Sequence, residues 1–147
     1  MKNVLLFILF LLITNISYSQ QFQSTKERNE NKPKLFDKHD TESFVHNNFF
    51  NSISSVKLGD KVTIQVSQKY IFKGIVTILH ETVDYRTISV DSEELPTLRL
   101  IVSHTSEDKY YGIIACLNHK DVLVLKQNET SKKYVWLKKE IADILPD

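Results

Sequence analysis

Apolar and polar residues alternate along most of the chain after residue 55, and this alternation predicts β-strands. The turn pair Gly59-Asp60 opens the pattern, because glycine accepts a positive φ and aspartate bonds its own backbone. Val62, Ile64 and Val66 then alternate with polar residues. Seven strands are expected, over residues 61–66, 70–79, 85–91, 98–103, 110–117, 122–125 and 134–137.

This spacing places the chain in the all-β class. No long helix separates the strands, which argues against a parallel α/β sheet. We expect a small antiparallel sandwich or a partly open barrel of about seven strands, with a short N-terminal helix. Gly74 and Gly112 lie inside predicted strands, where glycine usually marks a bulge or a sharp bend. Residues 141–145 are expected to form a last helical turn, which Pro146 ends.

The short helix is predicted over residues 41–53, where Val45, Phe49 and Ile53 recur at helical spacing. Asp40 or Thr41 is the expected cap. Two interpretations of this segment stay open. It plugs one end of the β-core by covering Tyr134 and Trp136, or it is a docking segment for a partner.

The N-terminus has the pattern of a secretory signal peptide over residues 1–19. Lys2 precedes an apolar run of ten residues, Val4 to Ile13, which is too short to span a bilayer. Ser17 and Ser19 are suited to cleavage before Gln20. The sequence therefore predicts export to the periplasm or the extracellular space, with no stable membrane anchor after cleavage. Residues 20–40 are polar and are expected to be a flexible arm, followed by a single β-domain over residues 41–147.

Charge and cysteine content narrow the function classes. Lys2 is the only charge in residues 1–19, so removal of this segment leaves 18 Lys+Arg (19 − 1) against 18 Asp+Glu. A neutral chain has no electrostatic reason to bind nucleic acid. Cys116 is the only cysteine, so an intramolecular disulfide is impossible, and its apolar strand favours a buried thiol.

The sequence contains no catalytic signature, so we expect a protein that is not an enzyme. The histidines lack the spacing of a helical metal site, and no G-x-S-x-G motif is present. We therefore expect no catalytic residue, no metal and no cofactor. Lys132, Lys133, Lys138 and Lys139 flank Tyr134 and Trp136. Such lysines bind acidic polymers or guard an edge strand, and the neutral net charge favours the second interpretation.

Loose motifs carry a resemblance to a known module. They are L-G-D-K-V-x-I at residues 58–64, Phe72 to Val76, Tyr111 to Ile114, Val122 to Leu125 and the closing residues 134–147. Together they resemble the β-rich N-terminal, propeptide-like module of secreted bacterial metalloproteases over roughly residues 56–147. Because the sequence stops at Asp147, we expect a stand-alone module and transfer no catalytic residue. The resemblance implies a module that binds, chaperones or inhibits a peptidase.

The sequence thus predicts an exported, non-enzymatic β-module that binds a protein partner. The alternative is an extracytoplasmic module for a small apolar ligand or a glycan. An unpaired edge strand would favour the first, and a concave aromatic pocket the second. The candidate partner-binding residues are the aromatic ones of the two segments just described: Phe44, Phe49, Phe50, Tyr134 and Trp136.

Overall fold

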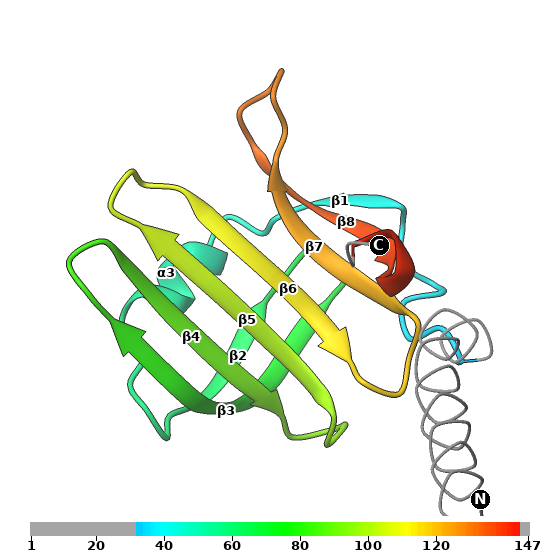
Figure 1. Cartoon of the computed structure of the whole chain (residues 1–147), viewed down its shortest axis with the longest axis horizontal. Coiled ribbons are helices and arrows are strands. Elements are labelled where there is room, and N and C mark those ends of the chain that lie inside the picture. Colours follow the sequence, from blue (N-terminus) through cyan, green and yellow to red (C-terminus); the bar gives the residue numbers. More distant parts are fainter. Residues whose placement is uncertain (1–31, 145–147) are drawn as a thin grey trace, which may run out of the picture. The chain divides into compact units, whose positions relative to one another are not determined.

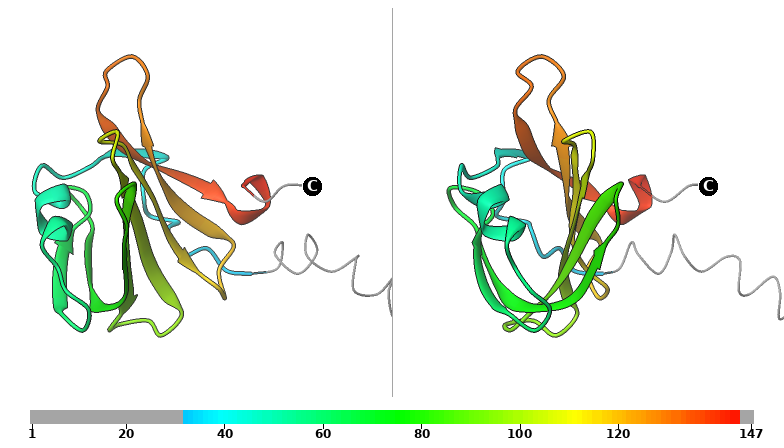
Figure 2. Two further views of the ribbon diagram at one scale, coloured as in Figure 1. Left: turned by 60° about the vertical axis from the view of Figure 1, so that its left-hand side comes forward. Right: turned by 90° about the vertical axis from the view of Figure 1, so that its left-hand side faces the viewer.

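Eight antiparallel strands form one open sheet that curls into a half-barrel (Figures 1 and 2). The computed structural model describes residues 32–144, and the fold belongs to a compact unit that starts at Pro33. The strand order is β1-β8-β7-β6-β5-β4-β3-β2. In chain order the elements are β1 (Glu42–Phe44), α3 (Phe49–Ser54), β2 (Lys61–Gln65), β3 (Ile71–Glu81), β4 (Tyr85–Ser92), β5 (Leu98–Thr105), β6 (Tyr110–Cys116), β7 (Asp121–Gln127), β8 (Tyr134–Glu140) and the 3₁₀ turn η1 (Ile141–Asp143).

The all-β prediction is confirmed, and of the two expected architectures the structure is the partly open barrel. Each of the seven predicted segments is a strand, from β2 to β8, and each pairs with its sequence neighbour. The short connections explain this order, because hairpins join adjacent antiparallel strands. The predicted final turn is η1, although residues 145–147 lie outside the described part of the chain.

The two strand glycines allow close packing. The β3–β4 register shifts between Val76 and Ile78, so the irregularity lies beyond Gly74 rather than at it. A Cβ on Gly74 would clash with the backbone carbonyl oxygen of Asp91 in β4. A Cβ on Gly112 would lie 3.1 Å from the carbonyl oxygen of Ile101. Close approach of the neighbouring strand therefore excludes a side chain at Gly74 and disfavours one at Gly112.

The helix predicted over residues 41–53 is wrong at its N-terminal end. Residues Glu42–Phe44 form β1, which pairs with β8, and the helix α3 begins only at Phe49. Sheet pairing thus overrides the helical spacing, because β8 supplies backbone partners that an isolated turn lacks. The spacing remains correct for Phe49 and Ile53, which are the buried residues of α3. Beyond the ends of β1 and β2 the chain makes one isolated bridge across the open side, with Val45 opposite Ser67, and His46 donates its backbone N–H to the carbonyl of Val66 at 3.1 Å.

Residues 33–40 differ from the flexible arm expected over residues 20–40. We call this segment the strap. Its Phe36 is only 1% exposed and belongs to the hydrophobic core. The buried carboxylate of Asp121 accepts the backbone N–H groups of Leu35, at 2.6 Å, and Phe36, at 2.8 Å. Lys138 also donates to the carbonyl of His39 at 2.8 Å, so the strap is fixed to β7 and β8. The signal peptide and residues 20–31 of the arm lie outside the described residues.

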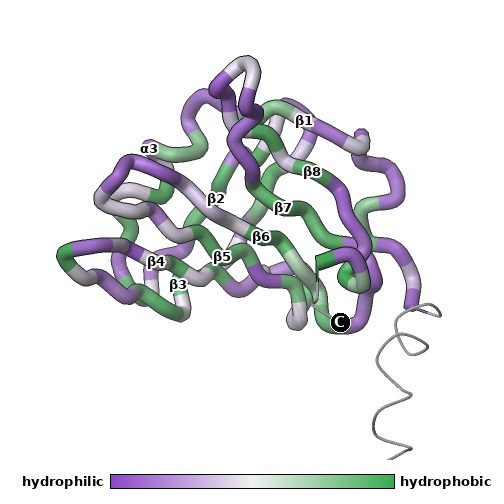
Figure 3. The backbone as a smooth tube through the Cα atoms, turned by 45° about the horizontal axis from the view of Figure 1, so that its top comes forward, coloured by the Kyte–Doolittle hydropathy of each residue, from purple (hydrophilic) through white to green (hydrophobic). Residues whose placement is uncertain are grey.

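Large apolar side chains fill the inside of the half-barrel. The biggest fully buried ones are Trp136, Phe36, Phe49 and Phe72. Phe49 of α3 packs edge-on against Trp136 at 5.5 Å between ring centroids. The indole N–H of Trp136 bonds the carbonyl of Val66 at 3.2 Å, across the interior. Hydrophobic positions concentrate along the strands, while many connecting loops are hydrophilic (Figure 3).

Candidate functional site

A surface hollow of about 360 Å³ collects residues from β1, the start of α3 and the β7–β8 hairpin. We call it the Phe44 groove. It contains three of the five predicted partner-binding residues, Phe44, Phe50 and Tyr134, and two of the lysines that the sequence singled out. The lining residues are Phe44, Val45, His46, Asn47, Phe50, Lys132, Lys133 and Tyr134.

Phe44 lies at the edge of the sheet and is 63% exposed. Its backbone is fixed by the pairing of β1 with β8, where Phe44 lies opposite Val135. Successive residues of a strand point to opposite faces, so Phe44 and Glu42 share a face while Ser43 points to the other. The ammonium group of Lys133 lies 6.0 Å above the Phe44 ring. Other large apolar side chains of the described residues are exposed as well, such as Leu117 and Tyr111, so Phe44 stands out by its place beside the hollow rather than by its exposure.

Phe50 and Tyr134 form the aromatic wall of the groove. Phe50 packs against Tyr134 at 5.1 Å and against Tyr110 at 4.1 Å between ring centroids. The hydroxyl of Tyr134 accepts the backbone N–H of Tyr110 at 2.9 Å. Burial raises the pKa of Tyr110, so its hydroxyl stays protonated at neutral pH. This wall is therefore mainly apolar, and the Tyr134 hydroxyl oxygen is already bonded to the Tyr110 backbone.

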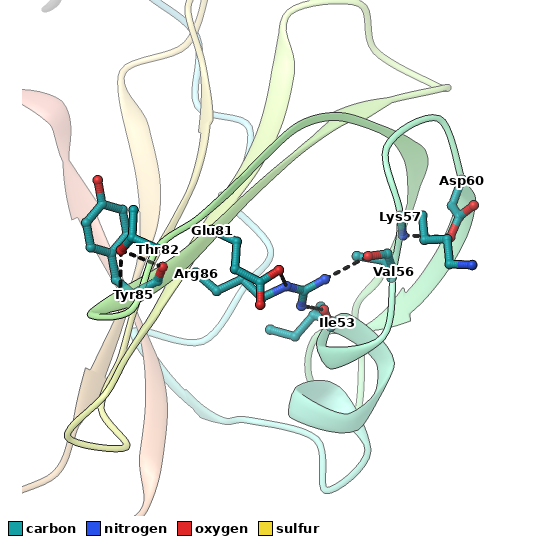
Figure 4. A network of polar contacts seen from close by, with 8 residues as sticks. All are labelled: Ile53, Val56, Lys57, Asp60, Glu81, Thr82, Tyr85 and Arg86. Carbon is teal, nitrogen blue, oxygen red and sulfur yellow. Dashed lines mark hydrogen bonds and ion pairs between the residues drawn. The ribbon is translucent and has the colours of Figure 1, made fainter.

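The position of α3, and with it Phe50, depends on Arg86 of β4 (Figure 4). The guanidinium donates to the carbonyl of Ile53 at 2.8 Å and to that of Val56 at 2.7 Å. The Ile53 carbonyl lies at the C-terminal end of α3, where a cation also interacts favourably with the helix dipole, and Val56 follows just after the helix. Glu81 lies 3.7 Å from the same guanidinium. Because six residues do not form a stable helix in water, this contact and the burial of Phe49 hold α3 in place.

The β7–β8 hairpin carries the two lysines of the groove on a locked turn. It projects beyond the rest of the sheet (Figure 2). The Asn128 side-chain oxygen accepts the backbone N–H groups of Thr130 and Ser131 at 3.1 and 3.0 Å. The backbone carbonyl of Asn128 accepts the backbone N–H of Lys132 at 2.8 Å. Lys132 itself has a φ of 57°. A lysine in this left-handed region is disfavoured, so the hydrogen bonds hold a specific turn.

The other two predicted partner-binding residues lie beneath the groove. Phe49 and Trp136 are both 0% exposed and belong to the core. Of the two interpretations of the 41–53 segment, core packing is therefore confirmed for Phe49, whereas Phe44 faces solvent. Trp136 is buried, so Trp136 and Tyr134 do not both face solvent.

The edge-guard interpretation of the lysines is wrong for β8. This strand lies between β1 and β7, so it is not an edge, and Lys132 and Lys133 lie in the hairpin before it. Lys138 instead holds the strap. Sequence reasoning missed His46 and Asn47. Their only signal is their position between Phe44 and Phe50, and the approach of the hairpin is not visible in the sequence.

Other candidate chemistry in the described part of the chain is sparse. Cys116 is buried, and its sulfur lies 3.0 Å from both the Thr97 hydroxyl and His119 Nδ1. Across residues 32–144 no group of three or more His, Cys, Asp or Glu side chains could hold a metal ion. In the same residues no helix is long and apolar enough to cross a membrane.

Comparison with known proteins adds no relative. No family model, no curated protein and no solved structure matches the chain. The fold and the Phe44 groove are therefore interpreted from their own geometry, as those of a small half-barrel β-domain.

Proposed function

We propose that this chain is an exported, non-enzymatic β-module that binds a protein partner through the Phe44 groove. The partner class implied by the sequence resemblance is a peptidase, which the module would inhibit or chaperone. Export rests on the signal-peptide pattern of residues 1–19.

The observation that carries the proposal is the exposed ring of Phe44 beside a preformed hollow. Aromatic residues are enriched at protein interfaces, and the few residues that dominate binding energy are often large rings next to a pocket. Phe44 is 63% exposed, while the walls of the groove are held by sheet pairing, by Arg86 and by the Asn128 turn. A fixed surface loses little conformational entropy on binding.

Two further features favour a protein over a small ligand. The inside of the half-barrel is filled, and the hollow beside Arg86, His104 and Tyr110 has only about 70 Å³. The Phe44 groove, at about 360 Å³, reaches the size of a ligand pocket, but it is a hollow open at the surface, whereas ligand pockets enclose most of the ligand. In addition, β2 ends the sheet with the exposed residues Lys61 and Thr63. Such an edge can accept a partner strand. The alternative, a glycan or small apolar ligand, would stack on Phe50 and Tyr134 in the open groove.

Site-specific photo-crosslinking tests the proposal. A benzophenone amino acid would replace Phe44 in the producing cells, and crosslinked products would be identified by mass spectrometry. The matched control places it at Tyr111, another exposed aromatic residue, on β6 outside the groove. We expect one protein adduct specific to position 44. Adducts that are the same at both positions, or that contain only glycan, would overturn the protein-binding proposal.

A further inference from the structure

Resting on the proposed function, we infer that the segment recognised by the Phe44 groove is acidic, with a large apolar side chain flanked by carboxylates. The groove combines two exposed lysines with three aromatic rings, and none of its lining residues is acidic. The inference concerns the chemistry of the partner, which neither the fold nor the exposure of Phe44 specifies.

The positive charge of the groove is not neutralised within the domain. Neither Lys132 nor Lys133 forms a salt bridge with another residue of the described part. Glu129 precedes Lys132 by three residues and Glu42 precedes Phe44 by two, but neither carboxylate lines the hollow. Several lysines and arginines elsewhere in the described part do pair with a carboxylate, as Lys61 does with Glu93 at 3.2 Å. The two groove lysines are thus available to an external anion.

Among the remaining polar groups of the groove, His46 and the two lysines favour a hydrogen-bond acceptor, whereas the Asn47 amide can both donate and accept. His46 Nδ1 accepts the backbone N–H of Asn48 at 3.3 Å. In the neutral ring the proton then lies on Nε2, which is a donor. The ammonium groups are donors only, and the Tyr134 hydroxyl already accepts a hydrogen bond from Tyr110. A carboxylate, which is an acceptor only, complements these donors.

The locked hairpin gives this charge a fixed place. The Gln127 side chain donates to the carbonyl of Lys132 at 2.9 Å, and Asn128 donates its backbone N–H to the carbonyl of Lys133 at 2.8 Å. Both lysine backbones are thereby held at the rim, beside the apolar ring of Phe44. Charges at the rim of an interface mainly set specificity and association rate, while the apolar contact supplies affinity. The geometry therefore fits a segment with carboxylates next to an apolar anchor.

Fluorescence anisotropy with three synthetic peptides tests the inference on the purified protein. The first peptide has a Phe-Leu anchor flanked by glutamates. The second has lysines in place of the glutamates, and the third has serines in place of the anchor. We expect the first to bind most tightly. The double variant K132Q/K133Q should weaken it roughly fivefold at low salt, an effect that shrinks as salt rises.

The control variant K57Q/K73Q removes two exposed lysines that do not line the groove and should change the affinity by less than roughly twofold. If the lysine-flanked peptide binds as well as the acidic one and F44A weakens both, the groove binds peptides but the acidic preference is wrong. If F44A changes no binding of any peptide, the groove itself is not the site. Unchanged melting temperatures of all variants would confirm that each is folded.

Discussion

Replacing Phe36 by alanine should strongly destabilise the domain, although the residue lies in a polar stretch that resembles a linker. Phe36 is 1% exposed and packs against His39 and Tyr70, with ring centroids 5.3 and 6.0 Å away. Removing a fully buried phenyl ring typically costs about 3–5 kcal/mol. Domains of this size have a total stability of roughly 5–15 kcal/mol, so the loss is a large share.

Urea unfolding measures this effect directly. Trp136, the only tryptophan, is buried against Phe49, and its fluorescence reports loss of the core. F44A is the matched control, because it removes the same ring from a position that is 63% exposed. We expect F44A to change the free energy of unfolding by no more than about 0.5 kcal/mol. Equal stabilities of F36A and F44A would refute the conclusion that the strap belongs to the folded core.

The carboxylate of Asp121 provides an independent check on the strap. The variant D121A leaves the backbone N–H groups of Leu35 and Phe36 without their acceptor. A buried donor without a partner costs about 1–3 kcal/mol. Hydrogen exchange should show faster exchange at these two amides. If their protection is unchanged, Asp121 does not hold the strap.

Four further outcomes follow from particular residues. G74A should destabilise the domain by about 1–3 kcal/mol or more in a thermal melt, since its Cβ would clash with the next strand, whereas G112A should cost less. K132G should stabilise by roughly 1 kcal/mol, because the φ of 57° suits glycine; a lower melting temperature would contradict this. Burial lowers the pKa of His39, so stability should fall as pH drops below about 6.5, and H39Q should flatten that dependence. Intact mass of the exported protein should show cleavage before Gln20; a mass that retains residues 1–19 would exclude it.

The strands could be predicted because their signal is local. Alternation in β2, or the apolar run of β6, needs only neighbouring residues to be read. The Phe44 groove could be predicted in part for a similar reason, since the rings of the 41–53 segment and of β8 stand out against polar neighbours. Sequence alone could not separate Phe44 from Phe49, because the exposure of each depends on where β1 ends and α3 begins.

The strap and β1 could not be predicted, because their stabilising contacts are distant in the chain. Phe36 has no periodic apolar neighbours. Its backbone N–H bonds the side-chain carboxylate of Asp121, which lies 85 positions away in the chain. Likewise, β1 is a strand only because β8 lies beside it. The polar composition of residues 20–40 correctly indicates little regular secondary structure over residues 33–40, but it does not exclude one deeply buried ring.

The pairing of the first strand with the last has a consequence for how the domain folds. The pairing of β1 with β8 joins residues up to 95 positions apart (137 − 42), as in the pair Glu42 and Leu137. Long loops must close before such contacts form, and proteins with a high contact order fold slowly. Because Trp136 of β8 belongs to the core, the chain cannot complete that core until β8 has been synthesised. Late completion of the core fits the proposed export, because a chain that lacks its last strand passes more easily in unfolded form through a translocation pore.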